Sequence, residues 1–312
     1  MLDMHAKTAF PARTLLSPFG RCIDRTAARA MLPPDGRAID FSQPLGEAAL
    51  LSCDSLSWRI FKNPVSVLIG GITAVILELA EPAVRTGVWE HSSFRKDPLG
   101  RLQRTGLAAM MTVYGPRRAA ERMIAGVVRR HERIAGTTPH GVAYHANDPE
   151  LLDWVQATAT FGFVAAYSRY VSRLSSGEIS QIFAEGACTA RLYGAAGAPM
   201  SAIEWELLLE RMISRLEPSP IILDFIEIMR SRQVLPRPFR SLQGMIVRGA
   251  VELVPPRVRE HIGLTEKYGL RLGEASLLHF LCAAADKTVL PSSPPAQACR
   301  RLGLPAGHLY GR

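Results

Sequence analysis

An apolar run from Val65 to Leu77 is the feature that most constrains how this chain folds. Pro64 stands just before it, and proline suits the first turn of a helix, where its missing N–H costs nothing. Apolar side chains surround the resulting helix, which is typical of a helix buried on every side. The run falls short of the ~20 apolar residues that a membrane-spanning helix needs, and Gly70 and Gly71 interrupt it. We therefore expect a buried helix of a soluble protein, without an integral membrane segment.

Helix start and stop signals recur along the rest of the chain. Asp97–Pro98 and Asp148–Pro149 each join a capping residue to a proline suited to the first helical position. Helices are expected over residues 99–115, 117–136, 150–174, 178–193, 202–216, 220–232, 241–254, 258–264 and 274–286. Residues 137–147 read as a loop, no alternation typical of strands persists, and no repeat stands out. The sequence thus predicts an all-α protein.

The two ends of the chain differ in composition from this helical part. Five prolines break up residues 1–54, which we interpret as an irregular N-terminal extension with short helices. Residues 55–290 are expected to form one compact helical domain. Residues 291–312 are rich in Pro and Ser and are predicted to be a flexible tail.

Charge and cysteine content narrow the class of protein. The chain has 37 basic and 28 acidic residues, a net charge of +9, and such proteins tend to bind nucleic acid, lipid headgroups or an acidic cofactor. Its five cysteines are scattered singly, which argues against a zinc ribbon or a disulfide framework. No uninterrupted apolar segment near the N-terminus indicates a secretory signal. A cytoplasmic protein with reduced thiols is the expectation.

One histidine falls on the apolar face of the helix expected over residues 117–136. Ala120, Ile124, Val127, His131 and Ile134 follow the spacing of a single helical face, while the charged neighbours of His131 turn outward. The imidazole therefore projects into the interior of a helical bundle. A core histidine bonded to a carbonyl and an axial ligand of haem are both consistent with that position.

A basic cluster precedes this histidine. Arg101 and Thr105 share a helical face, and Arg104 is offset from Thr105 by about 100°. A guanidinium and a hydroxyl on one face suit a propionate or bound dioxygen, although taken alone these residues are better explained by a solvated basic face. Residues 94–136 hold ten basic residues against three acidic ones. A nucleic-acid partner is not expected, because no aromatic residues are interleaved and no binding motif is present.

Other residues give weaker signals. Glu90 beside His91 could move a proton or simply form hydrogen bonds at a loop end. His140 and His145 lie in the expected loop and are interpreted as surface polar residues. The chain contains no nucleophile elbow, His-Glu-x-x-His, P-loop or dinucleotide-binding glycine motif, which weakens the hydrolase, zinc-protease and nucleotide-binding interpretations.

Several separated motifs in one order resemble a known family. They are WRIFKNPVSVLIGGITAVILELAEPAV, GVWEHSSFRKDPLGRLQRT, YG, HERIAGT and YHANDPELLDWVQAT. From about Ser55 to Leu264 the chain resembles the catalytic domain of MpaB and the latex-clearing proteins, which are rubber oxygenases. The resemblance implies an all-α domain with a globin-like helical core that holds haem b. Characterised relatives cleave isoprenoid double bonds with dioxygen.

The resemblance also implies roles for individual residues. By position, the proximal iron ligand of the rubber oxygenases maps onto His131. Their Arg-x-x-Lys-Thr arrangement near the distal side of the haem reads R-L-Q-R-T here, so Arg101 and Thr105 match. Arg104 replaces a lysine that is able to cap the iron. Because an arginine stays protonated and is a poor iron ligand, we expect an open or water-occupied sixth position.

The expected activity is that of a haem b-dependent oxygenase acting with dioxygen on an apolar, isoprenoid or polyketide-like molecule. In it His131 binds iron, Arg101 and Thr105 orient oxygen or a propionate, Arg104 guards the distal pocket and Glu90 accepts a proton.

Two departures from the family leave an alternative open. Many members have His-Pro where this chain has Glu81-Pro82, and a histidine where it has Gln156. The alternative is a haem-free helical protein that binds a lipid or terpenoid without catalysis. The oligomeric state is left undetermined.

Overall fold

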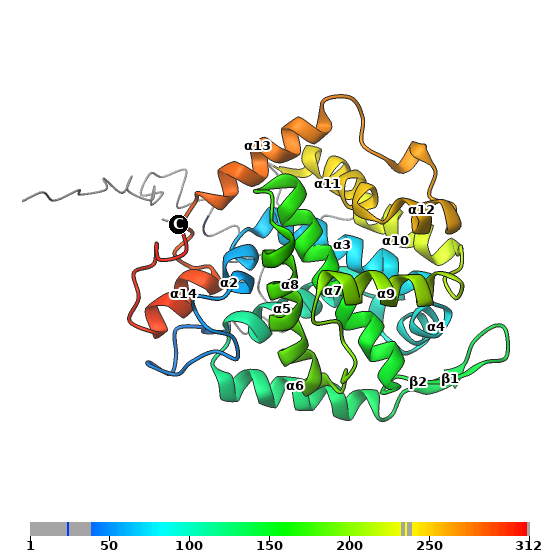
Figure 1. The fold of residues 1–312 in the computed structure, drawn as a ribbon, viewed down its shortest axis with the longest axis horizontal. Coiled ribbons are helices and arrows are strands. Elements are labelled where there is room, and N and C mark those ends of the chain that lie inside the picture. The colour runs from blue at the N-terminus through cyan, green and yellow to red at the C-terminus, as the bar shows by residue number, and fades with distance from the viewer. Residues whose placement is uncertain (1–23, 25–38, 232–234, 236–238, 311–312) are drawn as a thin grey trace, which may run out of the picture.

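The computed structural model describes Asp24, residues 39–231, Leu235 and residues 239–310. This part of the chain is built almost wholly of helices, which confirms the predicted all-α class (Figure 1). The β structure within it is a single antiparallel hairpin, in which β1 (Ala135–Thr137) pairs with β2 (Ala143–His145). The hairpin occupies the predicted loop; its strands of three residues are too short to leave an alternating pattern in the sequence.

The helices agree with the predicted ranges, apart from α2, α4 and α14, which were not predicted, and the end of α6. In chain order they are α2 (Leu56–Phe61), α3 (Pro64–Ala80), α4 (Pro82–His91), α5 (Pro98–Tyr114), α6 (Arg117–His131), α7 (Pro149–Tyr170), α8 (Ser176–Ala190), α9 (Ala202–Ile213), α10 (Pro220–Ser231), α11 (Arg240–Leu253), α12 (Pro256–His261), α13 (Glu274–Asp286) and α14 (Pro294–Arg301), with 3₁₀ turns η1 (Ser93–Arg95), η2 (Arg191–Tyr193) and η4 (Glu266–Tyr268).

Helix α3 is the central element, as its apolar sequence predicts. The Asn63 side chain caps it by accepting hydrogen bonds from the backbone N–H groups of Val65 (3.2 Å) and Ser66 (3.1 Å). Helices α4, α7, α10, α11 and α13 all pack against α3, and α7 does so most extensively. Within the described residues no single helix is long and apolar enough to span a membrane, although α3 and α4 together, bent by 106°, meet the length and composition criteria.

Two glycines let α3 and α7 approach each other closely. A Cβ atom on Gly70 would lie 2.6 Å from the carbonyl oxygen of Gly162, and one on Gly162 would lie 2.3 Å from the carbonyl oxygen of Gly70. Both distances are far inside van der Waals contact, so no side chain fits at either position. Gly70, which interrupts the apolar run, therefore allows the backbones of α3 and α7 to come together.

The C-terminal segment differs from the flexible tail that the sequence predicts. Residues up to Tyr310 are described, and they include α14, which begins with two buried prolines. Arg301 is buried, and its guanidinium donates hydrogen bonds to the carbonyl oxygens of Glu47 (2.7 Å), Tyr114 (2.7 Å) and Phe41. These bonds hold α14 against the segment before α2 and against the end of α5. Of the predicted N-terminal extension, residues 1–23 and 25–38 lie outside the described residues.

The contact between α3 and α7 can be tested with two alanine substitutions. We expect Gly162→Ala to lower the free energy of unfolding by about 1–3 kcal/mol, because the new methyl group overlaps a backbone carbonyl. Gly71→Ala is the matched control, since its Cβ would lie 3.9 Å from the Phe163 ring. That variant should be neutral or more stable by up to about 1 kcal/mol through helix propensity. Denaturant unfolding measures both, and equal effects would contradict the close approach.

Candidate functional site

Three ionisable side chains from three helices interact inside the bundle. They are Glu78 in the last turn of α3, Arg101 in the first turns of α5 and His131 at the end of α6. The positive charge of Arg101 lowers the pKa of both Glu78 and His131. Among the described residues none of the three forms an ion pair with another, so they are close enough to feel each other's charge without touching. This group is the candidate site.

The carboxyl group of Glu78 is strongly perturbed. Burial raises its pKa to about 7, and the charge of Arg101 offsets that effect only in part. The reason lies in the sequence of α3: Glu78 is the only charged residue of this helix, whose other faces pack into the core. A carboxyl group with this pKa is half protonated near neutrality and can hold or release a proton. Sequence analysis missed it, although a lone acid in an apolar helix was the available signal.

His131 faces the interior, as the helical spacing predicts. Ala120 and Ile124 of the same face are buried, and His131 itself is half-buried. Its Nδ1 atom is buried and has no hydrogen-bond partner among the residues that the structure describes. A helix C-terminus favours a cationic histidine by about 0.3–1 kcal/mol at an exposed site. Here burial and Arg101 prevail and lower the pKa of His131 below its usual 6.5, so the imidazole is neutral at neutral pH.

Arg101 is the charge that the other two groups share. Burial lowers its pKa most, Glu78 raises it and Arg104 lowers it. A guanidinium remains protonated even so, because its ordinary pKa exceeds 12. The site therefore keeps one fixed positive charge between a neutral imidazole and a carboxyl group that titrates near pH 7.

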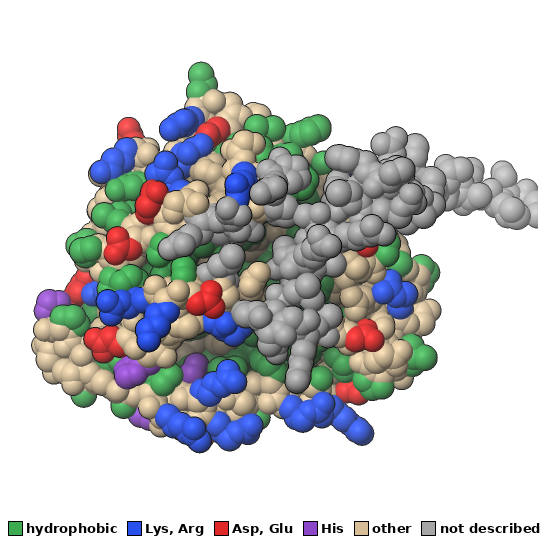
Figure 2. Space-filling view, turned by 180° about the vertical axis from the view of Figure 1, so that it is seen from behind, with side chains coloured by type: hydrophobic (Ala, Val, Ile, Leu, Met, Phe, Trp, Pro, Cys, Tyr) green, Lys and Arg blue, Asp and Glu red, His purple; other side chains and the backbone are tan. Residues whose placement is uncertain are grey.

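The structure does not place the other predicted residues with these three. Arg104 is exposed and binds the hydroxyl group of Ser93 and the carboxylate of Asp97 (3.5 Å). The exposed Thr105 hydroxyl group donates to the backbone carbonyl of Arg101 at 2.9 Å. Glu90 is exposed at the end of α4. Outward-facing cations gather along the edge of the molecule formed by α6 (Figure 2).

Comparison with known families bears on this geometry. A family model described as "ER-bound oxygenase mpaB/B'/Rubber oxygenase, catalytic domain" matches residues 58–285. The chain belongs to this family. The match supports oxygenase activity and contains Glu78, Arg101 and His131, whereas α14 lies beyond it. No curated protein and no solved structure matches the chain.

The two departures from the mpaB/rubber oxygenase pattern have different surroundings. Glu81 is buried at the junction of α3 and α4, where its carboxylate accepts from the backbone N–H of Val84 (2.8 Å) and pairs with Arg215 (3.2 Å). It is therefore a paired, structural carboxylate. Gln156 is half-buried on α7.

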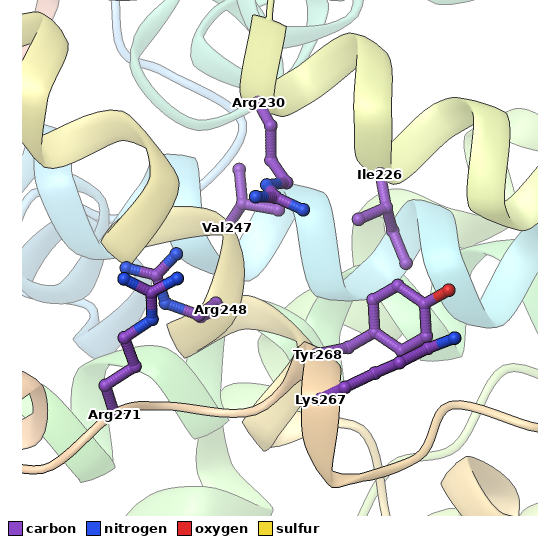
Figure 3. Close-up of a pocket in the computed structure, with 7 residues that line it drawn as sticks. All are labelled: Ile226, Arg230, Val247, Arg248, Lys267, Tyr268 and Arg271. Atoms are coloured by element: carbon purple, nitrogen blue, oxygen red, sulfur yellow. The ribbon is translucent and has the colours of Figure 1, made fainter.

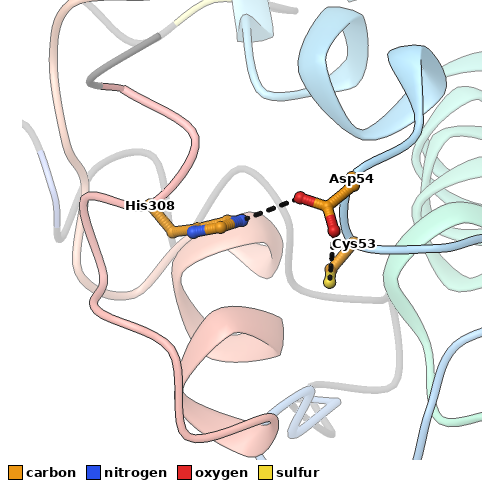
Figure 4. A group of neighbouring side chains, drawn as sticks. All are labelled: Cys53, Asp54 and His308. Atoms are coloured by element: carbon orange, nitrogen blue, oxygen red, sulfur yellow. Dashed lines mark hydrogen bonds and ion pairs between the residues drawn. The ribbon is translucent and has the colours of Figure 1, made fainter.

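Two further features lie apart from the candidate site. A cavity of about 620 Å³ opens between α7, α8, α9 and α13, and Phe161, Phe183 and Trp205 supply apolar lining. Cys53, Asp54 and His308 form a surface group whose potential ligand atoms all lie within 4.8 Å of one another (Figure 4). Asp54 is exposed, and all three residues fall outside the range that the family model matches.

The raised pKa of Glu78 predicts how stability depends on pH. A group that binds its proton more tightly in the folded state loses stability as the pH rises from its unfolded to its folded pKa, here from 4.5 to about 7. We expect Glu78→Gln to gain stability over the wild type across that range, by up to about 3 kcal/mol, and no further gain at higher pH. Denaturant unfolding over a pH series measures this. Glu90→Gln, at an exposed position, is the control and should show no such gain. If the difference in stability between Glu78→Gln and the wild type did not change with pH, the assignment would be refuted.

Proposed function

We propose that this protein is a haem b-dependent oxygenase that acts with dioxygen on an apolar small molecule, isoprenoid or polyketide-like, with His131 as the proximal iron ligand. The observation that carries the proposal is the neutral His131 imidazole with a buried, unpartnered nitrogen inside an oxygenase catalytic domain. Haem iron requires a neutral imidazole as its ligand. A core histidine of structural importance only would be expected to satisfy that buried nitrogen.

The surrounding residues fit such a cofactor. Arg101 supplies a fixed positive charge of the kind that binds a haem propionate through charge-assisted hydrogen bonds. Leu102, the next residue in the chain, packs against the main apolar cluster. When bound, haem supplies the iron centre at which dioxygen is activated. Arg104 contributes its charge, which reaches Arg101, from the exposed side of α5.

Glu78 is better suited than Glu90 to move a proton. A general acid or base works best when its pKa lies near the working pH, and the pKa of Glu78 is about 7. In the proposed role a carboxylate oxygen of Glu78 accepts a proton from the bound substrate and later returns it. The neighbouring Arg101 favours the carboxylate form that accepts the proton.

A haem-free protein that binds a lipid or terpenoid is the second candidate. Its specific support is the 620 Å³ cavity, whose aromatic lining suits an apolar ligand. This cavity shares no lining residue with the group of Glu78, Arg101 and His131. The two candidates therefore make separate predictions, because only the first requires His131.

Absorbance spectroscopy tests the proposed cofactor. The purified protein incubated with hemin should show a Soret band that His131→Ala loses, since the substitution removes the iron ligand. His91→Ala, an exposed histidine on α4, should keep the band. Circular dichroism should give the same helical content for both variants. A wild-type protein that takes up no hemin, or a band that survives in His131→Ala, would refute this function.

A further inference from the structure

A small pocket lined mainly by cations lies between α10, α11, η4 and the segment that joins η4 to α13 (Figure 3). Arg230, Arg248, Lys267 and Arg271 surround a space of about 30 Å³, with Ile226 and Val247 as apolar lining. These elements are distinct from those that carry Glu78, Arg101 and His131. The pocket therefore needs an explanation of its own.

One carboxylate, Glu274, binds within this group of cations. The Nε of Arg248 donates to Oε2 of Glu274 at 2.8 Å and a second nitrogen binds the other carboxylate oxygen, while both side chains are largely buried. The backbone N–H of Arg271 donates to the same carboxylate at 2.9 Å. The hydrogen bond from Arg248 is the main reason that the pKa of Glu274 is lowered. Glu274 thus fixes Arg248 and the loop before α13.

The other cations are not neutralised in the same way. Arg230 approaches Glu227 only at 3.7 Å, along the exposed surface of α10, and such pairs contribute little. The ammonium group of Lys267 lies 4.9 Å from the centre of the Tyr268 ring. Within the described residues neither the Lys267 nor the Arg271 side chain forms an ion pair. Positive charge therefore exceeds negative charge around the pocket.

We propose that this pocket binds one phosphate group of a ligand. Guanidinium groups donate paired hydrogen bonds that match the oxygens of a phosphate, and an ammonium group adds a point charge. Arg248 is held in position by Glu274, so little ordering is needed on binding. The space of about 30 Å³ is about two to three times the ~10–15 Å³ that a single water needs. It holds a single anionic group, and the rest of the ligand lies outside.

Two sources can supply that phosphate group: a free phosphate compound or the headgroup of a membrane lipid. Leu272 follows Arg271 directly and is fully exposed, and Leu277 and Phe280 project from the outer face of α13 with 43% and 67% of their surface exposed. Apolar side chains beside cations are typical of proteins that rest on an anionic membrane surface. The experiment therefore needs one arm for each source.

The test uses Lys267→Ala/Arg271→Ala, which removes two exposed cations of the pocket. Arg118→Ala/Arg122→Ala removes two exposed cations from α6 and gives the same change in net charge. Calorimetric titration with inorganic phosphate and pyrophosphate forms the first arm. Co-sedimentation with phosphatidylcholine vesicles, with and without phosphatidic acid, forms the second.

We expect the pocket variant to weaken binding at least about tenfold in one arm, since a charged hydrogen bond contributes about 1.5–3 kcal/mol. The α6 variant should bind like the wild type. Loss in the first arm identifies a free phosphate ligand, and loss in the second, shared by Leu272→Ser, identifies a lipid headgroup. No binding in either arm, or equal weakening in both double variants, would overturn the proposal. Hemin uptake should be unchanged throughout, so failure here is separable from failure of the proposed function.

Discussion

The close contact between α3 and α7 is the constraint on which the rest of the structure depends. Gly70 and Gly162 bring the two backbones together, and α3 is then enclosed by α7, α10, α11 and α13. Such packing leaves water little access to the last turn of α3. Glu78 lies in that turn, so the same packing that stabilises the core raises the pKa of its carboxyl group to about 7. The packing of helices around α3 thus accounts both for the core and for the raised pKa of Glu78 in the candidate site.

The residues of the candidate site come from helices that contribute to two apolar clusters. Helix α3 belongs mainly to the larger cluster, whereas Ala120 of α6 belongs to the second, together with residues of α2, α5 and α14. Glu78 and His131 are therefore carried by helices that pack in different parts of the core, and the charge of Arg101 of α5 acts on both. Burial is the larger influence on the pKa of both groups, and the positive charge of Arg101 adds to it at His131 and opposes it at Glu78. The proton-transfer candidate and the metal-ligand candidate thus respond to one shared charge in addition to their burial.

Much of the fold was predictable because its signals are local. Pro64 marks the start of α3, and α13 begins and ends where the sequence predicts. The inward position of His131 followed from helical periodicity. Glu78 could not be recognised in the same way, because its pKa depends on helices distant in sequence, whereas Glu90 had a suggestive neighbour but faces solvent. Arg301 binds carbonyl groups more than 180 residues away, which composition does not reveal.

Buried charged groups that pair with another group have a structural role in this protein, whereas a buried polar group without a partner is available to bind a ligand. Lys62 is buried with Asp286 at 3.0 Å, Glu81 with Arg215, and Arg301 with three carbonyl groups, and each of these contacts ties one segment to another. The buried side-chain atoms without a partner in the described residues belong to three indoles, a phenol, an amide and His131. His131 is the one group among them whose ordinary pKa lies near neutrality. A polar group that the fold buries and leaves unpaired lowers stability, and at this position a ligand from outside the chain would recover that loss.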